Sequence, residues 1–283
     1  MEALISQLVN RLKFVGGVKA IVLGGSRADD THRPDSDIDI GIYYLDQNEF
    51  DLKQIQTIAN AINDTSAPTV TAVGEWGRWV NGGAWLTIQG QKVDFLYRDL
   101  IFVRQIIQDC KKGMRQADFY QQPPFGFHSY IYCAEIRTCR VLFDPENLIS
   151  KLKAEVQEYP KALKNTIVND FLWDAEFSLL QCKKSALRGE VLIVAGCLTK
   201  IASDFVQVLC ALNEIFFIND KKIYKQEKAL RLKPDNFLER LNRILGQIGN
   251  SDIEMEKTLF EVEGLFDDFV KLAGDLYHPK FKY

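Results

Sequence analysis

The stretch LGGSRADDTHRPDSDIDI, residues 23–40, decides the fold of this chain. An apolar run from Val18 to Leu23 precedes it and has the length and composition of a buried strand. Two glycines and a serine follow, and then a polar loop leads into an alternation of aspartate with isoleucine. Five aspartates lie within the eleven residues from Asp29 to Asp39. This concentration of negative charge beside a glycine turn calls for a chemical explanation.

The glycine turn is Gly24-Gly25-Ser26. Glycine lets the backbone turn sharply and approach a ligand closely, and a serine hydroxyl with free backbone N–H groups can hold phosphate oxygens. A strand followed by two glycines is also common for steric reasons alone. Taken by itself, the turn favours that steric explanation over phosphate binding.

Asp37 and Asp39 are two residues apart, so in a strand their side chains point to the same side of the sheet. Ile38 and Ile40 then point to the other side, into a core. Two neighbouring carboxylates repel each other unless a cation lies between them, and oxygen ligands suit Mg²⁺ or Mn²⁺. The alternative is an edge strand with solvated aspartates, and the loop aspartates are expected to be of that solvated kind.

A third acid changes the balance between these interpretations. Asp94 lies between Val93 and Phe95 in another predicted strand. If that strand is adjacent to the strand of Asp37 and Asp39, three carboxylates converge. Such a set can hold two divalent cations and stabilise a leaving phosphate. The aspartates then become a docking platform for a nucleoside triphosphate rather than a source of repulsion.

Composition limits the function classes. The chain has 283 residues, 47% hydrophobic and 26% charged, which is typical of globular proteins. The net charge of −3 and the pI of about 5.8 do not favour a nucleic-acid partner. No apolar run of membrane-spanning length and no signal-peptide layout is apparent, and the six cysteines lack metal-ligand spacing. We therefore expect a cytoplasmic protein with reduced cysteines and no membrane partner.

The two halves of the chain have different patterns. The first half alternates amphipathic helices with strands expected at 18–23, 38–44, 69–73, 84–88 and 92–97, and Asp99 is expected to cap a helix. Past Pro145, helical patterns dominate, at about 147–159, 161–187, 190–212, 235–248 and 252–275. The predicted fold class is α+β, with a mixed-sheet catalytic domain over residues 1–145 and a helical bundle over 146–283.

These motifs together resemble the polymerase-beta-like nucleotidyltransferase superfamily. The resemblance rests on Gly24-Gly25-Ser26, on Asp37-Ile38-Asp39 after a polar loop, and on Asp94 in a later strand. Residues 75–100 and 208–222 also resemble bacterial stand-alone nucleotidyltransferases, among them aminoglycoside and lincosamide enzymes. Those proteins pair a catalytic domain with a helical one, which is the layout expected here.

The resemblance implies roles for individual residues. Asp37 and Asp39 would bind both metals, Asp94 would bind the catalytic metal and help deprotonate the acceptor, and Gly25 and Ser26 would hold the β- and γ-phosphates. The implied reaction is in-line attack of a hydroxyl on the α-phosphate of a nucleoside triphosphate, with ATP as the expected co-substrate and pyrophosphate as the leaving group. The implied acceptor is a small molecule, with an antibiotic as one candidate.

Basic and acidic residues outside the motif have two interpretations each. Arg27 would pair with a phosphate or lie at the surface, and Lys221 would reach the triphosphate or be a solvated loop lysine. Arg98 would contact substrate or pair with a structural carboxylate. Glu135 would act as a base toward the acceptor or lie on a helix surface.

Three tryptophans, Trp76, Trp79 and Trp85, lie in a glycine-rich segment where aromatic rings could stack on a base or on the acceptor. Core packing is expected for Trp85, and both roles remain open for Trp79.

Two other functions also remain open for the whole chain. One is nucleotidyl transfer to a protein or RNA, and the other is a non-catalytic, antitoxin-like nucleotide-binding role. The sequence identifies neither the acceptor nor the oligomeric state.

Overall fold

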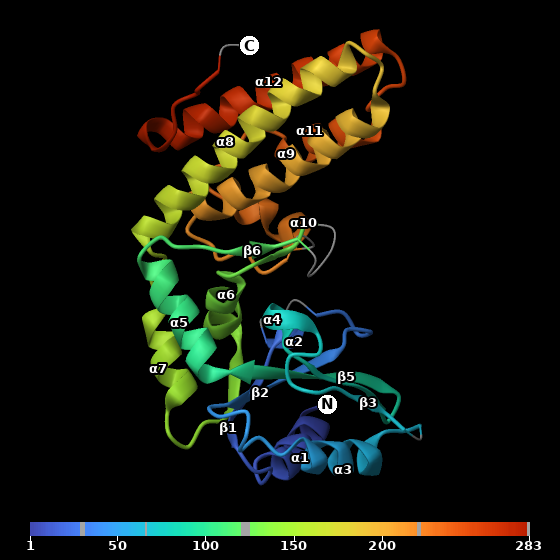
Figure 1. The fold of residues 1–283 in the computed structure, drawn as a ribbon, viewed down its shortest axis with the longest axis vertical. Coiled ribbons are helices and arrows are strands. Elements are labelled where there is room, and N and C mark those ends of the chain that lie inside the picture. The colour runs from blue at the N-terminus through green and yellow to red at the C-terminus, as the bar shows by residue number, and fades with distance from the viewer. Residues whose placement is uncertain (29–31, 66, 120–124, 220–221, 282–283) are drawn as a thin grey trace. The chain divides into compact units, whose positions relative to one another are not determined.

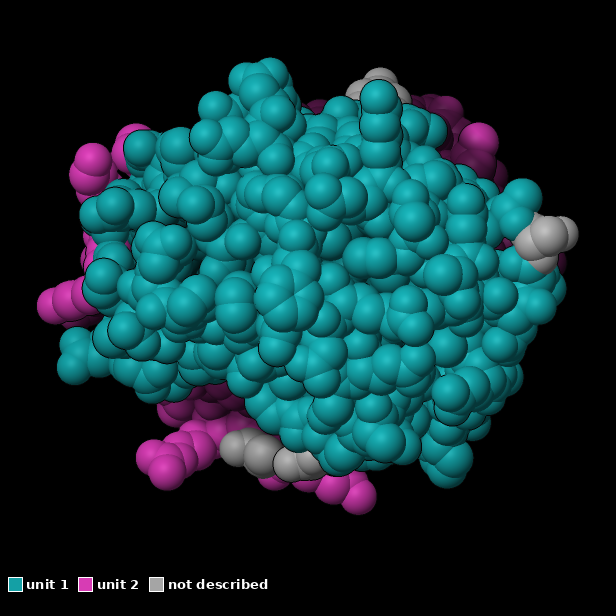
Figure 2. All heavy atoms as spheres, turned by 90° about the horizontal axis from the view of Figure 1, so that it is seen from below, with its two compact units in different colours: residues 1–109, 116–158 teal, residues 110–115, 159–283 magenta. Residues whose placement is uncertain are grey.

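The computed structural model describes residues 1–28, 32–65, 67–119, 125–219 and 222–281 (Figure 1). Two compact units make up the chain, coloured separately in Figure 2. Unit 1 comprises Met1–Asp109 and Gln116–Glu158, and unit 2 comprises Cys110–Arg115 and Tyr159–Tyr283. Residues 146–158, which the sequence analysis assigned to the helical half, lie in unit 1. The reason is that Lys153 donates hydrogen bonds to the carbonyls of Ile136, Arg137 and Cys139, all in unit 1.

A six-stranded mixed sheet forms the centre of unit 1, in the order β3-β4-β5-β2-β1-β8. Strands β2 and β5 run parallel, and every other neighbouring pair in this sheet is antiparallel. The strand bounds are β1 Val18–Leu23, β2 Ile38–Tyr44, β3 Thr69–Val70, β4 Gly83–Ile88, β5 Gln91–Asp99 and β8 Arg140–Phe143. The bounds of β1 and β2 are those predicted from the sequence, and β8 was not predicted.

One face of the sheet is apolar and is covered by α1 (Glu2–Leu12) and α3 (Leu52–Ile62), which lie side by side below the sheet in Figure 1. Ile38 and Ile40 are fully buried in this core, as the alternation predicted. The helices contribute the apolar stripes expected from their periodicity. The buried residues of this core on the two helices are Leu4, Ile5, Leu8, Leu12, Ile55 and Ala59. The aspartates of β2 and β5 therefore face the opposite side.

Shorter elements complete unit 1. The helices are α2 (Gly25–Ala28), α4 (Gly77–Val80), α6 (Ile131–Thr138) and α7 (Leu148–Glu155), and β6 (Ala117–Asp118) pairs with β7 (Phe127–His128). Helix α5 (Leu100–Lys111) follows β5 directly. Its first turn is capped as predicted, because the Asp99 carboxylate accepts from the backbone N–H groups of Ile101 and Phe102 at 2.8 and 3.1 Å.

Unit 2 is helical. Its elements are α8 (Lys161–Ala186), α9 (Val191–Leu212), α10 (Ile223–Gln226), α11 (Phe237–Gly246) and α12 (Asp252–Ala273), with short 3₁₀ turns at Glu227–Ala229 and Gly274–Leu276. Helices α8 and α9 form a hairpin, and aromatic contacts of Phe269 with Phe205 and Phe237 lie in the core. The long helices expected from the sequence are present, and the predicted α+β fold class is confirmed.

Helix α9 has, within the described residues, the length and composition of a membrane-crossing helix. This differs from the expectation that no apolar run in the chain is long enough. However, 56% of its most apolar window is buried inside the protein, as in a core helix. The apolar character of α9 is thus accounted for by packing against the other helices of unit 2.

Candidate active site

Strand register brings two of the three predicted aspartates together. In the parallel pair β2 and β5, Asp39 lies directly opposite Asp94. In the antiparallel pair β4 and β5, Trp85 lies directly opposite Asp94. Residues opposite each other on paired strands share a face of the sheet. Trp85, Asp94 and Asp39 therefore form a row across three strands, on the face away from the apolar core.

The glycine turn lies against Asp39. The backbone N–H of Gly24 donates to the carbonyl of Asp39 at 2.8 Å. Gly25 has a φ of +61°, a region that favours glycine, and a Cβ there would lie only 1.8 Å from Oδ2 of Asp39. Gly25 thus meets two requirements at once, because the turn needs its positive φ and the Asp39 carboxylate occupies the space that a side chain would take.

The carboxylates of this row are electrostatically strained. Burial raises the pKa of Asp39, and the charges of Asp37 and Glu135 add to the effect. Burial also raises the pKa of Asp94 to about 6, with further contributions from Asp39 and Asp37. Each carboxylate therefore resists ionisation beside the others. A bound cation would relieve that repulsion.

Asp37 lies one residue before β2 rather than within it. Arg27 holds this entry to the strand, because its Nε donates to the carbonyls of Ser36 and Asp37, both at 3.0 Å. The guanidinium therefore fastens the end of the loop that separates the glycine turn from β2. This contact gives Arg27 a structural role that the sequence did not indicate. Ser26 lies in α2 and is partly buried.

No group of three His, Cys, Asp or Glu side chains able to hold a metal ion is formed among the described residues. The donor set nevertheless fits a hard divalent cation. Asp37, Asp39 and Asp94 supply only oxygen atoms. Burial is the main cause of the raised pKa values of Asp39 and Asp94, and repulsion between the carboxylates adds to it.

Arg98 and Glu135 form an ion pair rather than separate substrate contacts. Nε and Nη2 of Arg98 each donate to one carboxylate oxygen of Glu135 at 3.0 Å. Arg98 is only 4% exposed, and its Nη1 donates to the carbonyls of Val80 and Tyr97. Burial lowers the pKa of Arg98, but the charge and hydrogen bonds of Glu135, together with Tyr132 and Tyr43, outweigh burial and raise it. Of the two interpretations of Arg98, the structure supports pairing with a structural carboxylate.

The burial of the tryptophans differs from what the sequence predicted for Trp85. Trp85 is 58% exposed, so the expected core packing is wrong. Its ring stacks on Trp76 with centroids 4.6 Å apart. Trp79 is the buried one, packed against Phe127 and other aromatic rings. Trp85 consequently stands exposed in the same row as the acids, and the ring of the partly buried Trp76 lies against it. Lys221, the predicted triphosphate ligand, lies outside the described residues.

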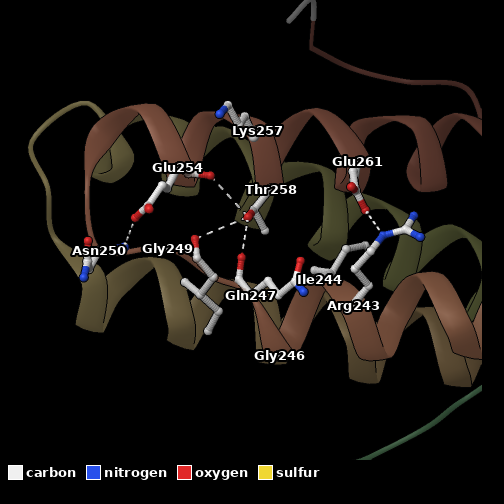
Figure 3. Close-up of a pocket in the computed structure, with 11 residues that line it drawn as sticks. Arg243, Ile244, Gly246, Gln247, Gly249, Asn250, Glu254, Lys257, Thr258 and Glu261 are labelled. Carbon is white, nitrogen blue, oxygen red and sulfur yellow. Dashed lines mark hydrogen bonds and ion pairs between the residues drawn. The ribbon is translucent and has the colours of Figure 1, made fainter.

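A cavity of about 570 Å³ lies elsewhere, between the end of α11 and the start of α12 (Figure 3). Thr258 stands in its wall and donates to the carbonyl of Gln247 at 2.8 Å. Its lining includes Arg243, Lys257 and Glu261. Every lining residue belongs to unit 2, and none is a predicted site residue.

One comparison with known proteins, the match to a family model, agrees with the motif. Residues 5–114 match the family model described as a nucleotidyltransferase domain. No curated protein matches the chain. A crystal structure of a nucleotidyltransferase-like protein from Exiguobacterium sibiricum 255-15 aligns with 96% of this chain and 78% of that chain, at 8% identity and a TM-score of 0.47. The segment that contains the glycine turn and all three aspartates therefore matches a nucleotidyltransferase domain, which supports the resemblance to the polymerase-beta-like superfamily.

Proposed function

We propose that this protein is a metal-dependent nucleotidyltransferase that moves a nucleoside monophosphate from a nucleoside triphosphate, with ATP as the expected donor, to a hydroxyl of a small molecule. One observation carries the proposal. Asp39 and Asp94 lie opposite each other on neighbouring parallel strands, with the Gly24-Gly25 turn against Asp39. The match of this segment to a nucleotidyltransferase domain supports nucleotidyl transfer in general.

Asp37, Asp39 and Asp94 would hold Mg²⁺ or Mn²⁺. When bound, such cations neutralise the charge of the triphosphate and of the departing pyrophosphate. Asp94 is a carboxylate that could accept a proton from an acceptor hydroxyl placed beside it. We assign it the proton of the acceptor hydroxyl, while Asp37 and Asp39 position the triphosphate for in-line attack.

The glycine turn would bind the distal phosphates. Gly25 presents backbone without a side chain directly beside Asp39, so a phosphate could approach both the backbone and the metal ligands. Ser26 would contribute its hydroxyl. Arg27 would act mainly through the loop carbonyls that it already binds. Its positive charge makes only a small contribution against the overall rise in the pKa of Asp39.

The base of the nucleotide, or a ring of the acceptor, would stack on Trp85. This side chain is exposed, is backed by Trp76, and stands directly opposite Asp94. Stacking of a base on an aromatic side chain is worth about 1–3 kcal/mol and tolerates every base. Such a platform would contribute affinity without deciding which nucleotide is used.

An antibiotic is one candidate acceptor within the small-molecule class. Transfer to a protein or to RNA keeps the same chemistry with another acceptor, and labelling of lysate proteins with radioactive ATP would reveal a protein target. An antitoxin-like regulator would bind nucleotide without turnover. The presence of all three carboxylates favours an active enzyme over that regulator.

The test is pyrophosphate release with ATP, GTP, CTP and UTP plus Mg²⁺ across aminoglycosides, lincosamides and simple sugars. We expect release with at least one acceptor, and its loss in Asp39→Asn. The matched control is Asp35→Asn, because the Asp35 side chain is 72% exposed and its ion pair among the described residues is with Arg33 of the same loop. Unchanged release in Asp39→Asn would overturn the proposal, and silence with intact Mg²⁺-dependent nucleotide binding would favour a macromolecular acceptor or a regulatory role.

A further inference from the structure

Two cysteines of unit 2 meet across the α8–α9 hairpin. Cys182 lies in the last turns of α8, and Cys197 lies in the second turn of α9. Sγ of Cys182 is 3.8 Å from the carbonyl oxygen of Val194, which is one helical turn before Cys197. This contact brings the Cys182 thiol to the part of α9 that carries Cys197, where the two thiols influence each other electrostatically. Residues 187–190 alone connect the helices, so the hairpin itself holds the thiols together.

The two thiols differ in exposure. Cys182 is fully buried, whereas Cys197 is partly exposed. All six cysteines of the chain lie within the described residues, and the other four are buried. Cys197 is therefore the cysteine that a reagent in solution reaches most easily, and its neighbour is protected behind it.

The proximity of the two thiols also makes them chemically unequal. The neighbouring Cys182 thiol lowers the pKa of Cys197 below its ordinary value, against the opposing effect of burial. The Cys197 thiol, together with burial, raises the pKa of Cys182. At neutral pH, Cys197 therefore has more thiolate character than an ordinary thiol. In contrast, burial raises the pKa of Cys139 to about 11.

A structural metal does not explain the pair. Two thiolates need further ligands to complete a tetrahedral site. No third His, Cys, Asp or Glu side chain completes such a group in the part of the chain that the structure describes. The pairing of an accessible thiol with a protected one instead matches the arrangement of a reactive cysteine and its resolving partner.

We propose that Cys197 and Cys182 form an oxidisable dithiol that reacts with hydroperoxides and closes to a disulfide between α8 and α9. The Cys197 thiolate attacks the peroxide, so an S–O bond forms, the O–O bond breaks, and the departing oxygen takes up a proton. Sulfur of Cys182 then attacks sulfur of Cys197. The S–S bond forms, the S–O bond breaks, and the hydroxide accepts the Cys182 proton to leave as water. For hydrogen peroxide, two thiols and one peroxide give one disulfide and two waters.

Trypsin makes the product easy to identify. Cleavage after Lys164, Lys183, Arg188 and Lys200 puts Cys182 in peptide 165–183 and Cys197 in peptide 189–200, and each remaining cysteine falls in a different peptide. The experiment treats the reduced full chain with hydrogen peroxide, alkylates the free thiols, digests without reductant, and identifies the peptides by mass spectrometry. We expect the 165–183 and 189–200 pair as the main cross-linked product, and its disappearance after treatment with dithiothreitol.

Three variants separate the roles. Cys182→Ala should leave Cys197 as a sulfenic acid that dimedone traps, and Cys197→Ser should abolish both trapping and cross-link. Cys139→Ser should form the cross-link like the unmodified chain. Circular dichroism confirms that each variant is folded, and iodoacetamide should modify Cys197 first in the unoxidised protein. The proposal is overturned if oxidation spreads evenly over the cysteines, or if the sulfenic acid of the unmodified chain persists without a cross-link.

Discussion

Gly25→Ala should disable the site while the fold survives. A Cβ at this position would lie 1.8 Å from Oδ2 of Asp39, and real Cβ contacts are essentially never shorter than 3.0 Å. The carboxylate must therefore move by at least about 1.2 Å, the difference between these two distances. A misplacement of about 1 Å in catalytic machinery can cost roughly 100-fold in rate. We expect a loss of that order in kcat/KM.

The backbone cost is separate from the collision. A residue other than glycine at a φ of +61° is destabilised by about 1–2 kcal/mol. Gly90→Ala isolates this cost, since Gly90 also has a positive φ, +74°, but nothing lies within 4 Å of its Cβ position. Gly24→Ala tests the effect of an added methyl group alone, because the atom nearest to a Cβ at this position would be Cβ of Asp39, at an ordinary contact distance of 3.7 Å.

Urea unfolding and Mg²⁺-dependent nucleotide binding on the three variants complete the assay, with pyrophosphate release once an acceptor is known. Gly25→Ala and Gly90→Ala should lose similar stability, and Gly24→Ala should lose little. Only Gly25→Ala should lose nucleotide affinity and turnover. Wild-type binding and turnover in Gly25→Ala, at the same loss of stability as Gly90→Ala, would refute the placement of Asp39 against the turn.

Three further predictions follow from the same face of unit 1. Glu135→Gln leaves the buried charge of Arg98 uncompensated and should lower the free energy of unfolding by about 3 kcal/mol in urea titrations. A loss of activity without any loss of stability would instead identify Glu135 as a base. The pKa of Asp94 is about 6 in the folded protein against 3.8 ordinarily, so this group stabilises the metal-free fold increasingly as pH falls through 6 toward 4. Mn²⁺ affinity needs the ionised carboxylate and should fall over the same pH range. Both trends should flatten in Asp94→Asn, and pH profiles unchanged by that substitution would contradict the assignment. Trp85→Ala should weaken nucleotide or acceptor binding by about 1–3 kcal/mol at unchanged thermal stability. Trp79→Ala should instead destabilise the fold by about 3–5 kcal/mol. A loss of stability in Trp85→Ala but not in Trp79→Ala would restore a core role for Trp85.

Strands and helices with strong periodicity were predictable from the sequence. The apolar run Val18–Leu23 and the alternation around Asp39 define β1 and β2 without tertiary information. The long helices of unit 2 follow from a 3.6-residue apolar period punctuated by proline and by short polar turns. Strand β8 has four residues, begins two residues after α6, and carries no alternation long enough to detect.

Side-chain partners across the fold were not predictable. Arg98 and Glu135 are 37 residues apart, and nothing in the sequence of either indicates the other. Alternation assigns Trp85 to one face of β4, but it does not tell which face another layer covers, so an exposed tryptophan looks like a core residue. The role of Arg27 depends on how the following loop folds back, which local pattern does not reveal.

The most direct test of the central claim is calorimetric titration of a non-hydrolysable ATP analogue into the protein, with and without Mg²⁺. The unmodified chain and Asp35→Asn should bind the analogue in a Mg²⁺-dependent way, and Asp39→Asn should bind at least about tenfold more weakly. Equal affinity in Asp39→Asn and the unmodified chain, or binding that ignores Mg²⁺, would contradict a metal-dependent nucleotide site at these aspartates.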